Sequence, residues 1–217
     1  MNVQLIQRLC SVERFAQYQR FCGGDDVKAW LLYQYNIELS ESLYTSLSIL
    51  EITLRNVIHR ELTNKYNSLE WYNEFAFHKN LEPLHNMILS AKENLNRDNK
   101  AITPDNIVAT LNFGFWTSVF NYRYERILWN KLRFAFPHMP RKRRTRKNVS
   151  SAINRIRQRL RNRVYHYEPI CWKINRTKQL HDEIYQLLGW INEESIAWLN
   201  NFDRFPNVID QFPLSDS

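Results

Sequence analysis

The sequence predicts an all-α protein, and three observations support this fold class. The 217 residues include only 4 glycines and 7 prolines. Apolar residues recur at three- and four-residue steps through most of the length, and no stretch is of low complexity. A chain of this size can bury one substantial core, so we expect a single domain over residues 1–217 with a basic loop near 137–148 and a C-terminal tail at 202–217.

The N-terminal third is predicted to form three helices. They span Val3 to Phe21, then Asp26 to Glu38 after a break at Gly23-Gly24, then Ser40 to Tyr66 with Ser40 as N-cap. The third helix has the clearest apolar stripe and is expected to lie at the centre of the core. The stripe consists of Leu43, Leu47, Leu50, Leu54, Val57, Ile58 and Leu62.

The middle of the chain alternates between irregular and helical segments. Residues 67–80 are aromatic without helical spacing, and 81–95 resume a helical pattern. Thr103-Pro104 is typical of a helix start, with a hydroxyl cap and a proline in the first turn. The apolar segment 111–116 contains Gly114 and favours a packed helix junction over a platform for stacking bases.

Two further helices are expected after the prolines at 137 and 140. Asn148 is the predicted N-cap of the first, and the second runs from about Thr177 to Asn201. The apolar face of the first helix is made of Val149, Ile153, Ile156, Leu160 and Val164.

Basic residues are concentrated in one part of the chain. The segment from Arg126 to Tyr167 holds fourteen of the 30 Lys and Arg residues and none of the 22 Asp and Glu residues. This distribution favours a surface for a polyanion such as RNA, and the alternative is a solvated, flexible loop. The predicted RNA-binding residues are Arg141, Lys142, Arg143, Arg144, Arg146, Lys147, Arg157, Arg159 and Arg163.

Several classes of protein are disfavoured. No apolar run reaches the roughly 18 residues that cross a bilayer, and the first residues lack the core of a signal peptide, so we expect a cytoplasmic protein without a membrane partner. The three cysteines form no CxxC pair and favour neither a disulfide framework nor a zinc site. We expect no metal and no other cofactor.

The segment 161–166 carries the chemistry that we expect. Its pattern is Arg161-Asn162-x-x-x-His166. RNA supplies its own nucleophile, the 2′-hydroxyl, so a cleaving enzyme needs a base for that proton and positive charge for the transition state. Histidine gains and loses protons near neutral pH, and arginine binds phosphate through planar donors. Three decoys share or nearly share the spacing: Arg133 to His138, Arg176 to His181 and Arg55 to His59.

One regular helix does not bring the three motif residues together. Asn162 and His166 are four residues apart and face the same way, whereas Arg161 is offset from His166 by roughly 140°. Three arrangements could bring the groups together. The long Arg161 side chain extends around the helix toward His166, or the helix becomes irregular between Tyr165 and Pro169, or two copies of the motif meet in a symmetric homodimer. The structural alternative is a histidine and an asparagine that make capping bonds at a helix end.

Three blocks of the sequence resemble the Abi-like (abortive infection) proteins of the HEPN superfamily: residues 50–55, 111–116 and 160–166. The resemblance implies a HEPN-like helical bundle with additional N-terminal and C-terminal helices. It also implies a homodimer in which the R-N-x-x-x-H motifs of the two protomers form one metal-independent endoribonuclease site, with Arg161, Asn162 and His166 as its residues. Such an enzyme would act in phage defence or as a toxin.

The resemblance also implies supporting residues and partners. Glu51 and Arg55 match the first block, and their spacing allows an ion pair within one helix. Tyr165 and Tyr167 are expected to line the site, and Tyr167 stands where the family often has a second histidine. An antitoxin or other regulatory partner is a further expectation.

Two other functions fit parts of the sequence. A non-catalytic RNA-binding or scaffold module keeps the basic segment and does not need His166. A DNA-binding protein would insert the helix 148–165 into the major groove, but the apolar stripe of that helix is needed for the core.

Overall fold

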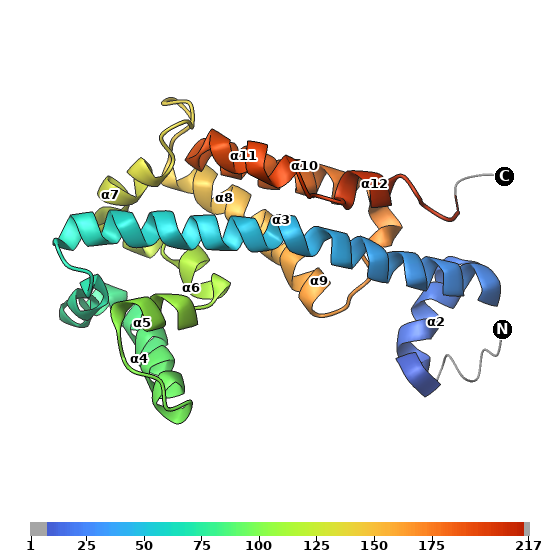
Figure 1. Ribbon diagram of the computed structural model, residues 1–217, viewed down its shortest axis with the longest axis horizontal. Coiled ribbons are helices and arrows are strands. Elements are labelled where there is room, and N and C mark those ends of the chain that lie inside the picture. Colours follow the sequence, from blue (N-terminus) through green and yellow to red (C-terminus); the bar gives the residue numbers. More distant parts are fainter. Residues whose placement is uncertain (1–7, 215–217) are drawn as a thin grey trace.

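One long helix, α3 (Asp26–Tyr66), forms the axis of the molecule. In the computed structural model, which describes residues 8–214, the other helices lie above and below it in the view of Figure 1. Residues 8–214 contain helices, turns and loops but no strand, so the all-α fold class is confirmed.

The predicted break between the second and third helices is wrong. α3 runs without interruption through Ser40, whose hydroxyl donates to the carbonyl of Asn36 at 2.7 Å instead of capping a new helix. Leu39 and Leu43 on either side are fully buried, so the apolar stripe continues across this point. The N-cap of α3 is Asp25, which accepts hydrogen bonds from the amides of Val27 and Lys28.

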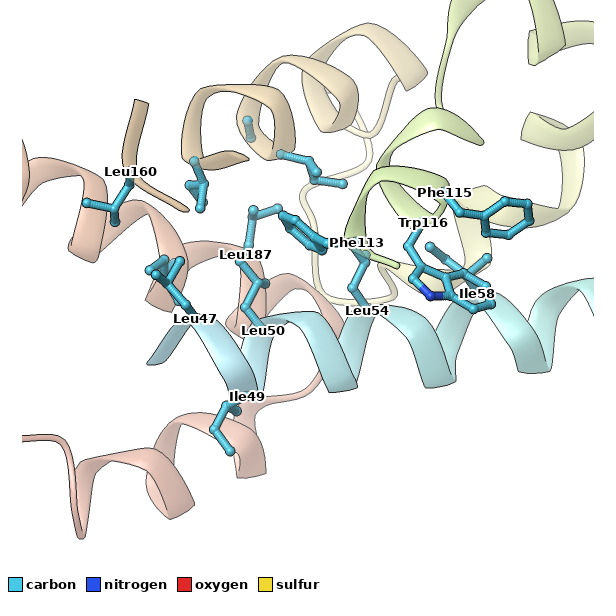
Figure 2. Close-up of a cluster of buried hydrophobic side chains, with 14 of the residues drawn as sticks. Leu47, Ile49, Leu50, Leu54, Ile58, Phe113, Phe115, Trp116, Leu160 and Leu187 are labelled. Atoms are coloured by element: carbon cyan, nitrogen blue, oxygen red, sulfur yellow. The ribbon is translucent and has the colours of Figure 1, made fainter. Parts of the chain in front are cut away.

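Helices from three other parts of the chain cover α3. The N-terminal α2 (Val12–Phe21) packs near its start, α6 (Phe113–Ser118) contacts its second half, and α10 (Ile174–Ile191) lies along it. Figure 2 shows the cluster that results. There Leu47, Leu50 and Leu54 meet Phe113, Leu160 and Leu187, while Ile49 points to the other side of α3.

The remaining elements complete the chain and give it the expected alternation of helical and irregular segments. They are η1 (Trp71–Phe77), η2 (Lys79–Leu81), α4 (Glu82–Arg97), α5 (Pro104–Thr110), η3 (Tyr122–Tyr124), η4 (Glu125–Trp129), α7 (Asn130–Leu132), η5 (Arg133–Ala135), α8 (Arg146–Ile156), η6 (Arg157–Arg161), α9 (Asn162–Tyr165), η7 (Cys171–Lys173), α11 (Glu193–Asn200) and α12 (Phe205–Ile209).

Several predicted boundaries need correction. The first helix was expected from Val3, but Ser11 interrupts the helical path, and positions 3–7 lie outside the described residues. The last helix begins at Ile174 and is divided at Asn192, which caps α11. The segment expected as a C-terminal tail contains α12, and its Phe205, Val208 and Ile209 are buried.

The helix that carries the motif is assembled from α8, η6 and α9. Its N-cap is Thr145, which accepts from the amide of Asn148, so the prediction of Asn148 as the cap is wrong. The five residues of η6 form a π-helical turn immediately before Asn162. The predicted apolar face is confirmed: Val149, Ile153, Ile156, Leu160 and Val164 are all buried, which removes this face from any DNA groove.

The segment around Gly114 is a packed junction, as predicted. Phe113, Phe115 and Trp116 are buried. A Cβ at Gly114 would lie 2.9 Å from the Asn112 side chain and 3.4 Å from the Arg157 guanidinium. Glycine therefore leaves room for the Asn112 side chain, whose oxygen caps α6 by accepting from the Phe115 amide at 3.1 Å.

Candidate functional site

His166 lies at the C-terminal end of the motif helix and is exposed. Its amide still donates to the carbonyl of Asn162 at 2.9 Å, but the next residue, Tyr167, has a left-handed backbone with φ of 57°. The amide of Glu168 then donates to the carbonyl of Arg163 at 2.8 Å, which completes a Schellman-type ending. The motif helix thus ends at His166, whose side chain is exposed to solvent.

Asn162 and His166 line the same cleft, as their spacing predicted. The cleft has a volume of about 780 Å³ and lies between the end of the motif helix and the start of α10. Four of its lining residues are cationic and one, Glu168, is acidic. The cations are Arg159, Arg163, Lys173 and Arg176. A cleft of this charge is suited to phosphate groups.

Arg161 does not line this cleft. Its guanidinium lies 3.7 Å from the Glu51 carboxylate of α3, 4.0 Å from the centre of the Tyr165 ring and 5.8 Å from that of Phe113. The Arg161 Nε atom is buried and has no hydrogen-bond partner among residues 8–214. Within one protomer the motif arginine therefore belongs to the contact between α3, α6 and α9, and not to the surroundings of His166.

Glu51 is held in the same contact. Burial raises the pKa of its carboxyl, and the opposing influences are Arg161, Arg55 and a hydrogen bond from the Phe113 amide. The cation within 4 Å of this carboxylate is Arg161 from another helix, and Arg55, the expected partner, acts more weakly. Glu51 thus supports the position of Arg161, and neither Glu51 nor Arg55 lines the His166 cleft.

Tyr165 and Tyr167 line a second, mainly apolar pocket of about 560 Å³. It shares no lining residue with the His166 cleft, and its walls include Ile37 and Tyr44 of α3. Tyr44 and Tyr165 stack with ring centres 6.3 Å apart. The carbonyl of Tyr167 accepts a hydrogen bond from Arg14 of α2 at 3.2 Å.

The predicted RNA-binding residues divide into two groups. Four of them bond within the protein: Arg144 to the carbonyls of Pro137 and Met139, Arg146 to Glu125 and the carbonyl of Phe120, Arg157 to Thr117, and Arg163 to Glu168 and the carbonyl of Pro169. The others are exposed side chains without a bonded partner in the part of the chain that the structure describes. These are Arg141, Lys142, Arg143, Lys147 and Arg159.

Geometry separates His166 from the two decoy histidines that are at least partly buried. His181 lies 2.7 Å from the carboxylate of Asp203 and stacks on Phe205, so it fastens α10 to the C-terminal segment. His59 accepts a hydrogen bond from the indole of Trp71 at 2.9 Å. His138, the third, is exposed beside the basic loop.

Sequence reasoning missed the residues that α10 and the turn before it add to the cleft. Trp172, Lys173 and Arg176 all line it. The signal was Pro169, which follows the end of the motif helix and cannot continue it, so a turn and a new helix are expected directly after His166. Arg176 had been noted only as part of a decoy spacing.

The three cysteines have free thiols, and Cys171 is buried. Residues 8–214 contain no group of three or more His, Cys, Asp or Glu side chains that could hold a metal ion. No helix within this range is long and apolar enough to span a membrane. Comparison of the chain with protein-family models, curated proteins and solved structures gave no match.

Proposed function

We propose that this protein is a metal-independent endoribonuclease that cleaves RNA by attack of the 2′-hydroxyl on the adjacent phosphate. The observation that carries the proposal is the position of His166, an exposed histidine on the wall of a cleft with four cations. The proposal takes up the expectation from the R-N-x-x-x-H pattern.

In the proposed reaction, His166 accepts the proton of the 2′-hydroxyl as that oxygen forms a bond to phosphorus. The bond from phosphorus to the 5′-oxygen breaks, and this oxygen takes up a proton from water, while His166 returns its proton to the solvent. The products are a 2′,3′-cyclic phosphate and a free 5′-hydroxyl. Asn162, one turn before His166 and on the same wall, is placed to orient the imidazole or the phosphate. The cations of the cleft stabilise the charge that develops on the phosphate oxygens.

The biological role remains an expectation from the resemblance. Phage defence by abortive infection, toxin activity, an antitoxin and a HEPN-type homodimer all depend on the three sequence blocks at 50–55, 111–116 and 160–166. A homodimer would also be consistent with the exposed apolar surface that surrounds Tyr44 and Tyr167.

A second candidate is a non-catalytic RNA-binding module. The observation that favours it is the position of Arg161, because the motif arginine pairs with Glu51 and lies outside the His166 cleft. Such a module would bind RNA through the exposed cations and would not need the histidine.

The first experiment incubates purified protein with a mixed pool of single-stranded RNA in excess EDTA. We expect the wild type to cut and His166→Ala to lose at least about a hundredfold in rate, because general acid–base catalysis contributes about 10²–10⁴-fold. His78→Ala is the matched control, since His78 is also exposed and does not line the cleft, and it should cut like the wild type.

The chemical ends of the fragments and the outcomes without cleavage also test the proposal. Fragments should end in a 2′,3′-cyclic phosphate, and RNA with 2′-O-methyl groups should resist cleavage. If all three proteins bind RNA and none cuts it, the non-catalytic candidate is favoured. If His166→Ala cuts as fast as the wild type, His166 is not the base.

A further inference from the structure

The cleft beside His166 is built on a turn that buried hydrogen bonds hold in place. The side-chain oxygen of Asn36, a buried residue of α3, accepts from the amides of Ile170 and Cys171 at 2.7 and 3.2 Å. The hydroxyl of Thr177, in the first turn of α10, donates to the carbonyl of Ile170 at 2.8 Å. These bonds fix the start of α10 relative to the end of the motif helix. The two walls of the cleft are therefore positioned before any ligand binds.

The four cationic side chains of the cleft differ in how many hydrogen bonds they already make within the protein. Arg163 already donates to the carbonyl of Pro169 at 2.8 Å and pairs with Glu168 at 3.3 Å. Arg176 donates from Nη1 to the side-chain oxygen of Gln179, and its other guanidinium donors have no bonded partner among residues 8–214. Arg159 is exposed and has no bonded partner among the described residues.

The two available arginines come from different helical segments. Arg159 belongs to η6, two residues before Arg161, and Arg176 belongs to α10. A guanidinium presents a planar set of donors that matches two oxygens of one phosphate. Lys173 adds an exposed charge directly before α10.

We propose that Arg159 and Arg176 bind RNA phosphate groups in the cleft that His166 lines. This inference rests on the proposed function, and it gives the phosphate-binding role to these two arginines instead of Arg161. The volume of about 780 Å³ is in the range of about 300–1,000 Å³ that is usual for small-molecule sites. It accommodates a nucleotide unit of an unpaired strand, and Trp172 supplies an aromatic wall of the kind that single-strand sites use.

The test measures binding separately from cleavage. The probe is a fluorescent single-stranded RNA with 2′-O-methyl groups throughout, which lacks the nucleophile and stays intact. We compare the wild type with Arg159→Gln and Arg176→Gln. The matched control is Arg97→Gln, which removes the same charge from an exposed position on α4 that does not line the cleft. Circular dichroism and thermal melting verify that every variant is folded.

We expect each cleft variant to bind on the order of tenfold more weakly and to lower the slope of log K against log salt by about 1, because one phosphate contact is lost. Arg97→Gln should change the affinity less than about twofold. A duplex of the same sequence should bind more weakly than the single strand.

The outcomes distinguish this inference from the proposed function. If the wild type binds the probe through Arg159 and Arg176 and yet cuts no RNA, the phosphate site stands and the nuclease proposal fails. If the wild type cuts RNA while both cleft variants bind and cut normally, the nuclease stands and this inference is overturned. Failure of the wild type to bind the probe, or equal losses in Arg97→Gln, overturns it as well.

Discussion

Arg161 and His166 are close in the sequence but have different surroundings. The arginine lies between Glu51 and the rings of Tyr165 and Phe113, with 24% of its side chain exposed, whereas the histidine is exposed beside the cleft. Loss of activity on replacing Arg161 therefore has two possible origins, chemistry and stability. They can be separated because Glu51 is the main ionic partner of Arg161.

A double-mutant cycle tests the structural role of Arg161. Glu51→Gln should lower the free energy of unfolding less than Arg161→Gln does, because burial already disfavours the charged form of Glu51 and Arg161 keeps its contacts with the rings of Tyr165 and Phe113. Arg161→Gln should cost about 2 kcal/mol, because it leaves a partly buried carboxylate without its nearest cation. The double variant should recover about half of that loss.

Urea unfolding of the four proteins measures the cycle. Additive losses in the double variant would contradict the structural role of the pair. The Asn162→Ala variant is a useful comparison, since Asn162 is adjacent in sequence and lines the cleft instead.

The composition of the sequence predicted where the basic region lies but not which of its arginines bond within the protein. Arg143 and Arg144 look alike in the sequence, yet the Arg144 side chain donates to two backbone carbonyls of its own loop. The Arg143 side chain is exposed and has no bonded partner among residues 8–214. Which arginine bonds internally depends on carbonyls that the fold brings near it, and no local pattern contains that information.

Among the elements, α3 and the motif helix show what periodicity predicts well. Their apolar stripes were identified correctly because burial of one helical face imposes the spacing. The break predicted at Ser40 is wrong because serine is a common N-cap, whereas burial of the apolar residues on both sides of Ser40 favours one continuous helix. The π-helical turn of η6 was not predicted, since apolar steps of four residues fit both helix types.

The C-terminal segment is joined to α10 by a buried polar cluster around Asp203. The side chain of Asp203 is 2% exposed. Its carboxylate accepts hydrogen bonds from the Tyr185 hydroxyl and the Phe205 amide and lies 2.7 Å from Nε2 of His181. Burial acts to raise the pKa of Asp203, but the bonds from these groups together hold that pKa below its ordinary value.

The stability that Asp203 contributes should therefore depend on pH. A depressed pKa in the folded state gives stabilisation that is fully present above the unfolded pKa of about 3.9 and is lost as pH falls through the folded value. Asp203→Asn should lower stability by about 2 kcal/mol near pH 6, and its difference from the wild type should shrink below about pH 4. Thermal melts across this range measure the difference, and a constant difference would contradict the assignment.

At the scale of the whole molecule, two surfaces meet at the end of the motif helix. One is the cationic cleft with His166, and the other is the apolar pocket with Tyr165 and Tyr167. Tyr44 and Tyr167 are 58% and 73% exposed at the second surface, as expected for a face that another protein covers. A homodimer through this face would leave the cleft of each protomer open, because the two surfaces share no residue.

Mixing of variants decides whether a dimer shares its catalytic site. His166→Ala is mixed with the Glu51→Gln/Arg161→Gln double variant, which is expected to keep more of its stability than Arg161→Gln alone. If each cleft is complete in one protomer, the RNA cleavage rate of the mixture equals the sum of the separate rates. If instead Arg161 of one copy serves His166 of the other, both variants are inactive alone, and random pairing restores about a quarter of the wild-type rate. Restored cleavage would show that Arg161 of one protomer acts with His166 of the other, because no protomer in the mixture carries both Arg161 and His166.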